Sequence, residues 1–214
     1  MKIREKGILS VVSGFSGAGK GSIMKELLSR HQSYALSISA TTRKPRKGEV
    51  DGREYFFKTV DQFEKMIANQ ELIEYAKYVD NYYGTPRRYV EEQLLAGKDI
   101  ILEIEMQGAL QIKERFPDAL LLFVAPPSAS ELKKRLTGRG TETMEVIESR
   151  MRRALEEAEY MEKYDYLIIN DKLEESAEEV HRIIQSAHAR ISFQSEFMSN
   201  IKQDLEQILK GDNK

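Results

Sequence analysis

The stretch GILSVVSGFSGAGKGS at residues 7–22 decides the fold, because two local patterns meet in it. A short apolar run, Ile8 to Val12, ends at Gly14 and predicts a buried strand. After the glycines, Ile23, Leu27 and Leu28 recur on one face of a helix that we expect from Lys20 to Arg30. The sequence therefore predicts a strand, a glycine-rich turn and a helix, in that order.

The turn has the chemistry of a phosphate-binding loop. Glycines allow the backbone N–H groups to converge on an anion, and the start of the following helix adds partial positive charge. Lys20 supplies a full charge for the outer phosphates of a nucleotide. The predicted phosphate-binding residues are Gly14, Phe15, Ser16, Gly17, Ala18, Gly19, Lys20, Gly21 and Ser22.

The loop departs from the strict pattern at one position. Gly21 stands where a Ser or Thr normally follows the lysine, and the hydroxyl comes one residue later, at Ser22. One residue turns a helical side chain by about 100°, so Ser22 cannot do the same work. The arrangement resembles a variant that recurs in nucleoside monophosphate kinases, where Mg²⁺ is held mostly by ATP phosphates and waters. The alternative is an ordinary turn from strand to helix.

Length and composition narrow the class of protein. The 214 residues suit one α/β domain with an insertion, or two small domains. The 33 basic and 35 acidic residues give a net charge of −2, which argues against nucleic acid as a partner. The absence of cysteine excludes disulfides and thiol chemistry. Because the apolar runs are short, we expect a cytoplasmic protein that binds no membrane.

Strands and helices alternate along most of the chain. Further buried strands are expected at 99–105, 119–125 and 164–170, and helices at 108–115, 130–136 and 145–163. This alternation predicts an α/β fold with a parallel sheet core and helices on both faces. Residues 38–90 break the rhythm, with short strands at 53–57 and 72–78 around a helix at 61–69.

We therefore expect a core of residues 1–37 and 91–190, a small mixed α/β insertion at 38–90 and a helical extension at 191–214. The extension carries an apolar stripe formed by Ile191, Phe193, Phe197, Ile201, Leu205 and Ile208. We expect this stripe to pack on the body of the molecule. A contact with a second subunit, as in a homodimer, is the alternative.

A second anion site is predicted within the insertion. Arg43 and Arg46 flank Pro45 in an extended or turn segment. Guanidinium groups bind phosphate through two parallel hydrogen bonds, and Tyr55 adds a neutral donor. Taken alone, the segment could also be a solvated charged loop. A nucleic-acid patch is a weaker alternative, because acidic residues interrupt it at Glu49, Asp51 and Glu54.

The glycine loop and this segment together resemble the guanylate kinase family. The stretch SISATTRKPRKGEVDGREYFF at 37–57 matches the GMP-binding segment of that family. Other matching blocks are IEYAKYVDNYYGTP at 73–86, LEIEMQGA at 102–109, APPS at 125–128, GRGTE at 138–142 and YDYLIIND at 164–171. The resemblance covers about residues 7 to 188. It implies an ATP:GMP phosphotransferase of purine metabolism that uses Mg²⁺ as a cofactor.

The resemblance also implies roles for individual residues. Arg43 and Arg46 would hold the GMP phosphate, with hydroxyl groups from Tyr55 and Tyr83. The guanine-binding residues would be Ser39, Glu74 and Thr85. A carboxylate at Glu74 suits the N–H donors of guanine and would repel the acceptor of adenine. Without the neighbouring blocks, a plain surface carboxylate on a strand is the favoured interpretation of Glu74.

Two acids, Glu103 and Glu105, end a predicted strand at the sheet edge where nucleotide sites occur. Because strand side chains repeat every two residues, both are expected to point the same way. By resemblance, one acid would order Mg²⁺ and its waters, and the other, Glu105, would reach the guanosine. The family usually has Asp at the position of Glu105.

The lid is expected at about residues 137–149. Arg139 and Arg150 resemble the two family arginines that close on the phosphates and take part in catalysis with Lys20 and Arg43. Asn170 follows the last strand, where the family contacts the adenine of ATP. The histidines, His31, His181 and His188, belong to none of these motifs, and we expect them on the surface or in packing.

These residues imply direct in-line transfer of the γ-phosphoryl group from ATP to GMP, with no covalent intermediate. Two alternatives remain. Guanylate-kinase-like domains of membrane scaffolds bind peptides and lack catalysis, although their glycine loop is typically degraded. A kinase of the same fold could instead use another acceptor, such as a phosphorylated ribose.

Overall fold

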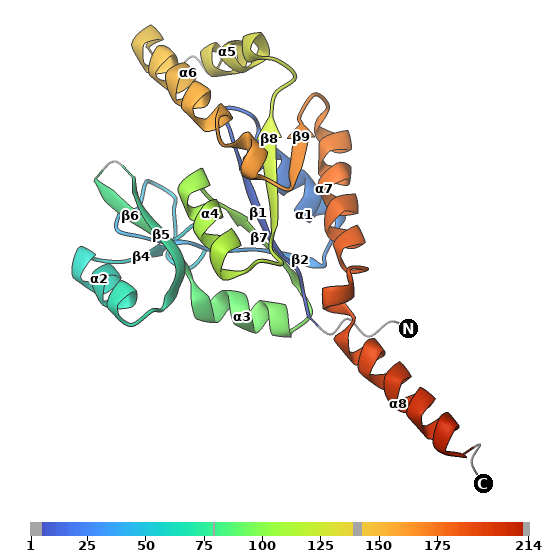
Figure 1. The fold of residues 1–214 in the computed structure, drawn as a ribbon. Coiled ribbons are helices and arrows are strands. Elements are labelled where there is room, and N and C mark those ends of the chain that lie inside the picture. Colours follow the sequence, from blue (N-terminus) through green and yellow to red (C-terminus); the bar gives the residue numbers. More distant parts are fainter. Residues whose placement is uncertain (1–5, 79, 139–142, 212–214) are drawn as a thin grey trace.

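A parallel five-stranded sheet forms the centre of the molecule (Figure 1). The structure, a computed structural model, describes residues 6–78, 80–138 and 143–211. The strand order is β2-β7-β1-β8-β9, and each neighbouring pair is parallel. The strands are β1 (Leu9–Gly14), β2 (Tyr34–Leu36), β7 (Asp99–Glu103), β8 (Leu120–Ala125) and β9 (Tyr166–Ile169). The predicted α/β fold class is confirmed, although the short strand β2 was not predicted.

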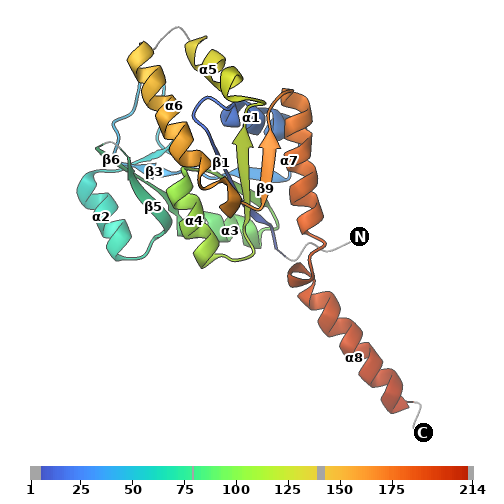
Figure 2. The same cartoon turned by 45° about the horizontal axis from the view of Figure 1, so that its top comes forward.

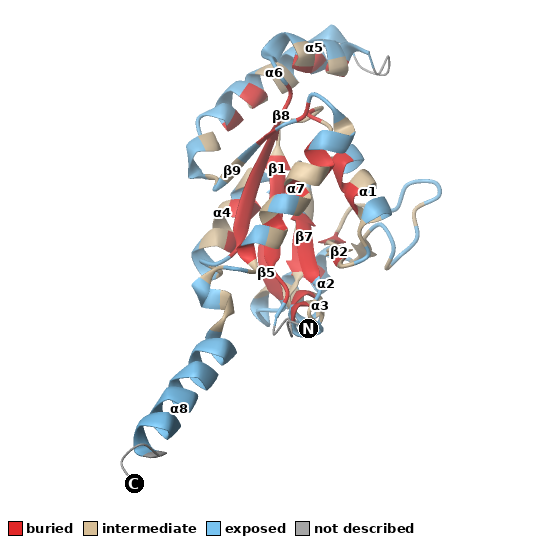
Figure 3. Ribbon diagram, turned by 90° about the vertical axis from the view of Figure 1, so that its right-hand side faces the viewer, coloured by how far each residue is buried: buried red, intermediate tan, exposed pale blue. Residues whose placement is uncertain are grey.

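Helices cover both faces of this sheet. The helices α1 (Lys20–Arg30) and α7 (Leu173–Ala187) pack on one face, and α3 (Arg87–Leu95) and α4 (Met106–Arg115) pack on the other. Val11 and Val12 of β1 are both fully buried, but they belong to the cores of opposite faces. A continuous apolar run is therefore what the centre of a parallel sheet requires, and Figure 3 shows the central strands β1, β7 and β8 as mostly buried.

A second, four-stranded sheet forms the inserted lobe. It contains β3 (Ala40–Thr41), β4 (Phe56–Phe57), β5 (Leu72–Tyr78) and β6 (Asn81–Pro86) in the order β4-β3-β6-β5. The helix α2 (Val60–Ala68) packs on it through the buried ring of Phe63. Thr59 and Gln62 form a reciprocal capping box that fixes where this helix begins. The strand predicted at 53–57 shrinks to two residues, because 52–54 form a turn.

Two helices lie beyond the carboxyl ends of the parallel strands (Figure 2). They are α5 (Ala129–Thr137) and α6 (Met144–Ala158), followed by a short 3-10 turn at Met161–Lys163. Leu132 and Leu136 of α5 pack against Ile147 and Ala154 of α6. The predicted lid at 137–149 spans the junction of these helices, and residues 139–142 of it lie outside the described part of the chain.

The last helix, α8 (Ser195–Gly211), projects away from the body after a short 3-10 turn at Ile191–Phe193 (Figures 1 and 3). Most of the predicted stripe is exposed, at Ile191, Phe197, Ile201, Leu205 and Ile208. Only Phe193 packs against the main core. The prediction that the stripe packs on the body is therefore wrong, because α7 already covers that face of the sheet. The alternative of a subunit contact stays a prediction.

None of the described helices has the length and apolar composition needed to cross a membrane.

Candidate functional site

A cavity of about 420 Å³ opens between the two sheets. Its size falls in the range of sites that hold small molecules. Its walls come from the ends of β1 and β7, from the inserted lobe and from α4 and α6. The lining residues are Gly14, Lys20, Leu36, Ser37, Ser39, Glu54, Tyr55, Glu74, Ala76, Tyr83, Glu103, Ile104, Glu105, Met106, Gly108, Phe123 and Glu157.

The glycine loop requires glycine at two positions for different steric reasons. Gly14 has a φ of 148°, and a Cβ there would lie 2.1 Å from the carbonyl oxygen of Val124. Gly19 has a φ of 97°, and a Cβ there would lie 2.3 Å from Nδ2 of Asn170. Gly19 also precedes the first residue of α1, so the loop delivers the positive end of that helix to the cavity.

Lys20 is held inside this loop. Its Nζ donates to the carbonyl oxygens of Gly14 at 2.7 Å and Phe15 at 3.2 Å. Burial lowers the pKa of Lys20, and the nearby carboxylates of Glu103 and Glu105 oppose that shift. The ammonium group is thus positioned and largely desolvated, which is the condition under which one charge acts strongly on a phosphate.

Glu103 and Glu105 both line the cavity. Strand β7 ends at Glu103, and the backbone is still extended at Glu105, the residue before the first turn of α4. The extended backbone at Glu105 agrees with the predicted alternation, which turns both carboxylates the same way. Burial raises the pKa of Glu103, and Lys20 opposes it. The position that normally carries the loop hydroxyl, Gly21, faces Glu103, because a Cβ there would lie 3.8 Å from Oε1 of Glu103. The hydroxyl residue of this chain, Ser22, is exposed.

Glu74 is almost completely buried at 4% exposure, so its reading as a surface carboxylate is wrong. Its Oε1 accepts a hydrogen bond of 2.6 Å from the hydroxyl of Thr85, its neighbour on β6. Burial raises the pKa of Glu74 to about 7. The close approach of Gly108 makes room for the carboxylate, since a Cβ there would lie 2.6 Å from Oε2. Ser39 lines the same cavity.

Glu49 links the two predicted phosphate-binding arginines, and Arg43 lies beside the tyrosines. Nη2 of Arg43 donates to Oε1 of Glu49 at 2.8 Å, and this bond raises the pKa of Arg43. The other oxygen of Glu49 accepts from the backbone N–H of Arg46 at 2.7 Å. The guanidinium of Arg43 lies 5.2 Å from the ring centre of Tyr55, which meets Tyr83 edge to face. Glu49, read from sequence as an interruption, ties the segment together.

Helix α6 supplies two arginines to the site. Nη1 of Arg150 donates to the hydroxyl of Ser16 in the glycine loop at 3.3 Å. Arg153 bridges two acids, with Nη2 at 2.7 Å from Oε2 of Glu105 and Nε at 3.1 Å from Oε1 of Glu157. The sequence motifs assigned no role to Arg153 or Glu157. Arg139 lies outside the described residues.

Asn170 braces the glycine loop from the neighbouring strand end. Its Nδ2 donates to the carbonyl oxygen of Ala18 at 2.8 Å. Arg135 of α5 donates to the carbonyl oxygens of both Asn170, at 2.9 Å, and Ala18, at 3.3 Å. Arg135 was not predicted, because an i, i+4 pair with Glu131 on the same helix is a sufficient local explanation for it. The predicted contact of Asn170 with ATP stays a prediction.

A family model for guanylate kinase matches residues 6–187 of this chain. The chain belongs to the guanylate kinase family. The resemblance in the motifs is therefore confirmed over nearly the whole of the body.

Individual members of this family are similar over most of their length. A guanylate kinase of Lactococcus lactis is 51% identical over 189 residues, which cover 88% of this chain and 92% of that protein. One of Halalkalibacterium halodurans is 53% identical over 187 residues, covering 87% and 92%. The crystal structure of guanylate kinase from Anaplasma phagocytophilum superposes with a TM-score of 0.71 at 30% identity, covering 89% of this chain and 90% of that one.

The side chain of Phe15 anchors the glycine loop. Its ring meets the edge of Phe123 at 5.0 Å and contacts the small core between α5 and α6. Packing against β8 and the two helices thus holds this turn of the loop in place.

Proposed function

We propose that this chain transfers the γ-phosphoryl group of ATP to the phosphate of GMP, giving ADP and GDP. Phosphorylation of this kind is the activity for which guanylate kinases are named. The observation that carries the proposal is that one cavity holds both Lys20 of the glycine loop and the buried carboxylate of Glu74. A phosphate-binding loop alone would not specify the acceptor.

Guanine recognition is assigned to Glu74, Thr85 and Ser39. The carboxylate of Glu74 accepts from guanine N1–H and the 2-amino group, while Thr85 holds it in position through the 2.6 Å bond. Ser39 reaches O6, and Glu105 lies toward the guanosine. Adenine would leave the buried carboxylate without donors, and unpaired buried groups reject a wrong substrate strongly.

The acceptor phosphate is assigned to Arg43 and Arg46, with the hydroxyls of Tyr55 and Tyr83. Arg43 can keep its bond to Glu49, because a guanidinium has five N–H donors. The acceptor oxygen already carries negative charge, so transfer needs no general base. The inserted lobe of residues 38–90 and the lid at 137–149 would close over both nucleotides and exclude water.

The donor phosphates are assigned to the loop from Gly14 to Ser22 and the positive end of α1. Lys20 and Arg150 would neutralise charge on the transferred group, joined by Arg139 from the lid. Arg150 already touches the loop through Ser16. Catalysis then comes from alignment of the two nucleotides and from charge stabilisation.

The acids of the cavity fit a magnesium ion that arrives with ATP. Burial raises the pKa of the Glu103 carboxyl, so a cation nearby would stabilise its charged form. Carboxylate oxygens suit Mg²⁺, which keeps most of its waters and phosphate ligands in such sites. Glu103 would hold that water shell, and Ser22 is the second candidate. The ion would offset negative charge on the phosphate oxygens.

The test is a coupled assay of ADP formation with ATP and Mg²⁺, offering GMP, AMP, CMP and UMP in turn. We expect fast turnover with GMP alone. Turnover with a different acceptor only, such as a phosphorylated ribose, would favour the second kinase reading. Absence of turnover in folded protein would favour the peptide-binding reading.

A further inference from the structure

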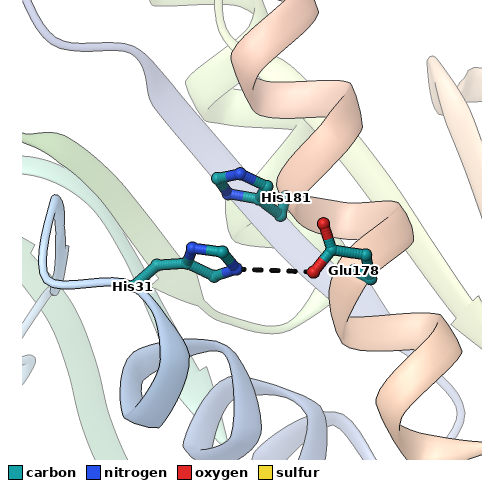
Figure 4. A group of neighbouring side chains, drawn as sticks. All are labelled: His31, Glu178 and His181. Atoms are coloured by element: carbon teal, nitrogen blue, oxygen red, sulfur yellow. Dashed lines mark ion pairs between the residues drawn. The ribbon is translucent and has the colours of Figure 1, made fainter.

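Three metal-ligating side chains meet on the face of the molecule where α1 packs against α7 (Figure 4). His31 follows the last residue of α1, and Glu178 and His181 project from α7. One nitrogen or carboxylate oxygen from each residue lies within 4.8 Å of the others. Because α1 has 11 residues, the cluster lies roughly 16 Å along that helix from Lys20. It is therefore separate from the nucleotide cavity.

One pair of donor atoms already has the spacing found in a small metal centre. Nε2 of His31 lies 3.5 Å from Oε2 of Glu178. Bonds of 2.0–2.2 Å in a tetrahedral zinc site separate neighbouring ligand atoms by about 3.3 Å. Glu178 and His181 are three residues apart, so they share one face of α7. Two histidines and one glutamate, with water in the fourth position, form an established ligand set for Zn²⁺.

The nitrogen of His31 supports this reading independently. Among the described residues, the buried Nε2 of His31 has no hydrogen-bond partner. Its 3.5 Å contact with Glu178 is at the outer limit and is an ion-pair distance only if His31 is protonated. Buried polar atoms in native proteins are normally satisfied, and a bound cation would satisfy this one.

His181 is oriented from behind by a hydrogen-bond chain. Its Nδ1 lies 2.7 Å from the hydroxyl of Tyr34. Nε2 of Gln185 donates to that hydroxyl at 3.0 Å and to the buried carboxylate of Asp99 at 3.3 Å. Metal-ligating histidines commonly use their second nitrogen in this way, which fixes the ring and its tautomer. The opposite nitrogen, Nε2, is then the metal-ligating atom.

The rings of His31 and His181 are stacked, with centres 3.7 Å apart and planes within 4°. An imidazole ligates in its own plane, so the two rings cannot share an ion until one of them turns. His31 is the ring that turns about its Cβ–Cγ bond, because Tyr34 holds His181.

We propose that His31, Glu178 and His181 form a binding site for a divalent transition metal of the Zn²⁺ class, which ties the end of α1 to α7. The nitrogen ligands favour such ions over Mg²⁺ or Ca²⁺. The side chain of Glu178 is 46% exposed, so an ion can enter from solvent. The site stabilises the body and takes no part in phosphoryl transfer.

The experiment is a Zn²⁺ titration of the full chain, free of any affinity tag and of nucleotide, by calorimetry, with Co²⁺ absorption as a second readout. We expect one ion per chain and a higher thermal midpoint with Zn²⁺. His31→Asn and Glu178→Gln should each weaken binding at least ~10-fold, at the scale of lost metal-site interactions. The control Glu174→Gln, an exposed residue one turn earlier on α7, should bind as the wild type does.

Two results would overturn the proposal. One is the absence of binding to the wild type at submillimolar Zn²⁺. The other is binding that survives both His31→Asn and Glu178→Gln but is lost in Glu103→Gln, which would place the ion in the nucleotide cavity. Circular dichroism and metal-free thermal midpoints establish that each variant is folded. Kinase activity of His31→Asn and Glu178→Gln should stay at the wild-type level.

Discussion

Lys20 supplies one buried positive charge to the nucleotide cavity. Two carbonyl oxygens hold its ammonium group, and burial lowers its pKa while the acids of the cavity keep it charged. We expect Lys20→Met to fold normally and to lose at least ~10²-fold in kcat, as for removal of one preorganised charge-stabilising group. The coupled ADP assay measures this, with circular dichroism as the control. Turnover near the wild-type rate would contradict the role of Lys20.

Glu74 links the site to stability through pH. Its pKa is raised from 4.5 to about 7 by burial, so the folded state binds the proton more tightly than the unfolded state. The resulting stabilisation is present below pH 4.5 and is lost as pH rises through about 7. Compared with Glu74→Gln, the wild type should lose up to about 3 kcal/mol of unfolding free energy over this range.

Urea denaturation of both proteins at pH 5 and pH 8 measures this difference. The glutamine variant is nearly isosteric and does not titrate, so it corrects for every other ionisable group. Parallel pH profiles for the two proteins would show that Glu74 titrates normally.

At the scale of elements, the turn from β1 to α1 depends on close approach to β8. A Cβ at Gly14 would lie 2.1 Å from the backbone oxygen of Val124. Gly48 also has a positive φ, 92°, but an added Cβ would meet nothing within 4 Å in the described part of the chain. Gly48→Ala should therefore cost only the backbone term of about 1–2 kcal/mol. Gly14→Ala should cost clearly more and should reduce ATP affinity.

Chemical denaturation measures the loss of unfolding free energy in each alanine variant. Because both glycines have positive φ angles, the difference between the two losses reports the steric clash at Gly14. Equal losses of stability would mean that β8 yields to the added methyl group.

The whole molecule consists of a body that contains the cavity and one helix that projects from it. From Ser195 to Lys210 the side chains of α8 are exposed. A chain ending at Gln194 retains Phe193, which packs on the core. We expect this chain to keep kcat within about 2-fold and its thermal midpoint within a few degrees, because exposed side chains contribute little to stability. A large loss of either would show that α8 supports the body, directly or through a second subunit.

At this scale the cavity joins residues that are distant in sequence. Lys20, Glu74 and Glu105 line one hollow although they come from the first turn of α1, from β5 and from the start of α4. The parallel sheet places the loops after β1 and β7 at the same edge, and the inserted sheet closes the other side.

The sequence by itself determined the local elements around the glycine loop. Helix α1 has the predicted bounds, and β5 matches the strand predicted at 72–78. Apolar periodicity and glycine positions are short-range signals, so they can be read without knowing the partners. The ordered motifs also identified the family, because they record the chemistry of a nucleotide site residue by residue.

Only the tertiary structure decided the partners and the burial of each group. It placed Arg153 against Glu105, Arg135 against a loop carbonyl, and Glu74 at the almost fully buried wall of the cavity. It left the stripe of α8 exposed, and it brought His31 to α7. These contacts join segments 48 to 150 positions apart, roughly, and periodicity describes only what lies within a few turns of a helix. Whether an apolar or charged face is covered depends on which other element packs against it. That is decided by the tertiary structure and not by the local sequence.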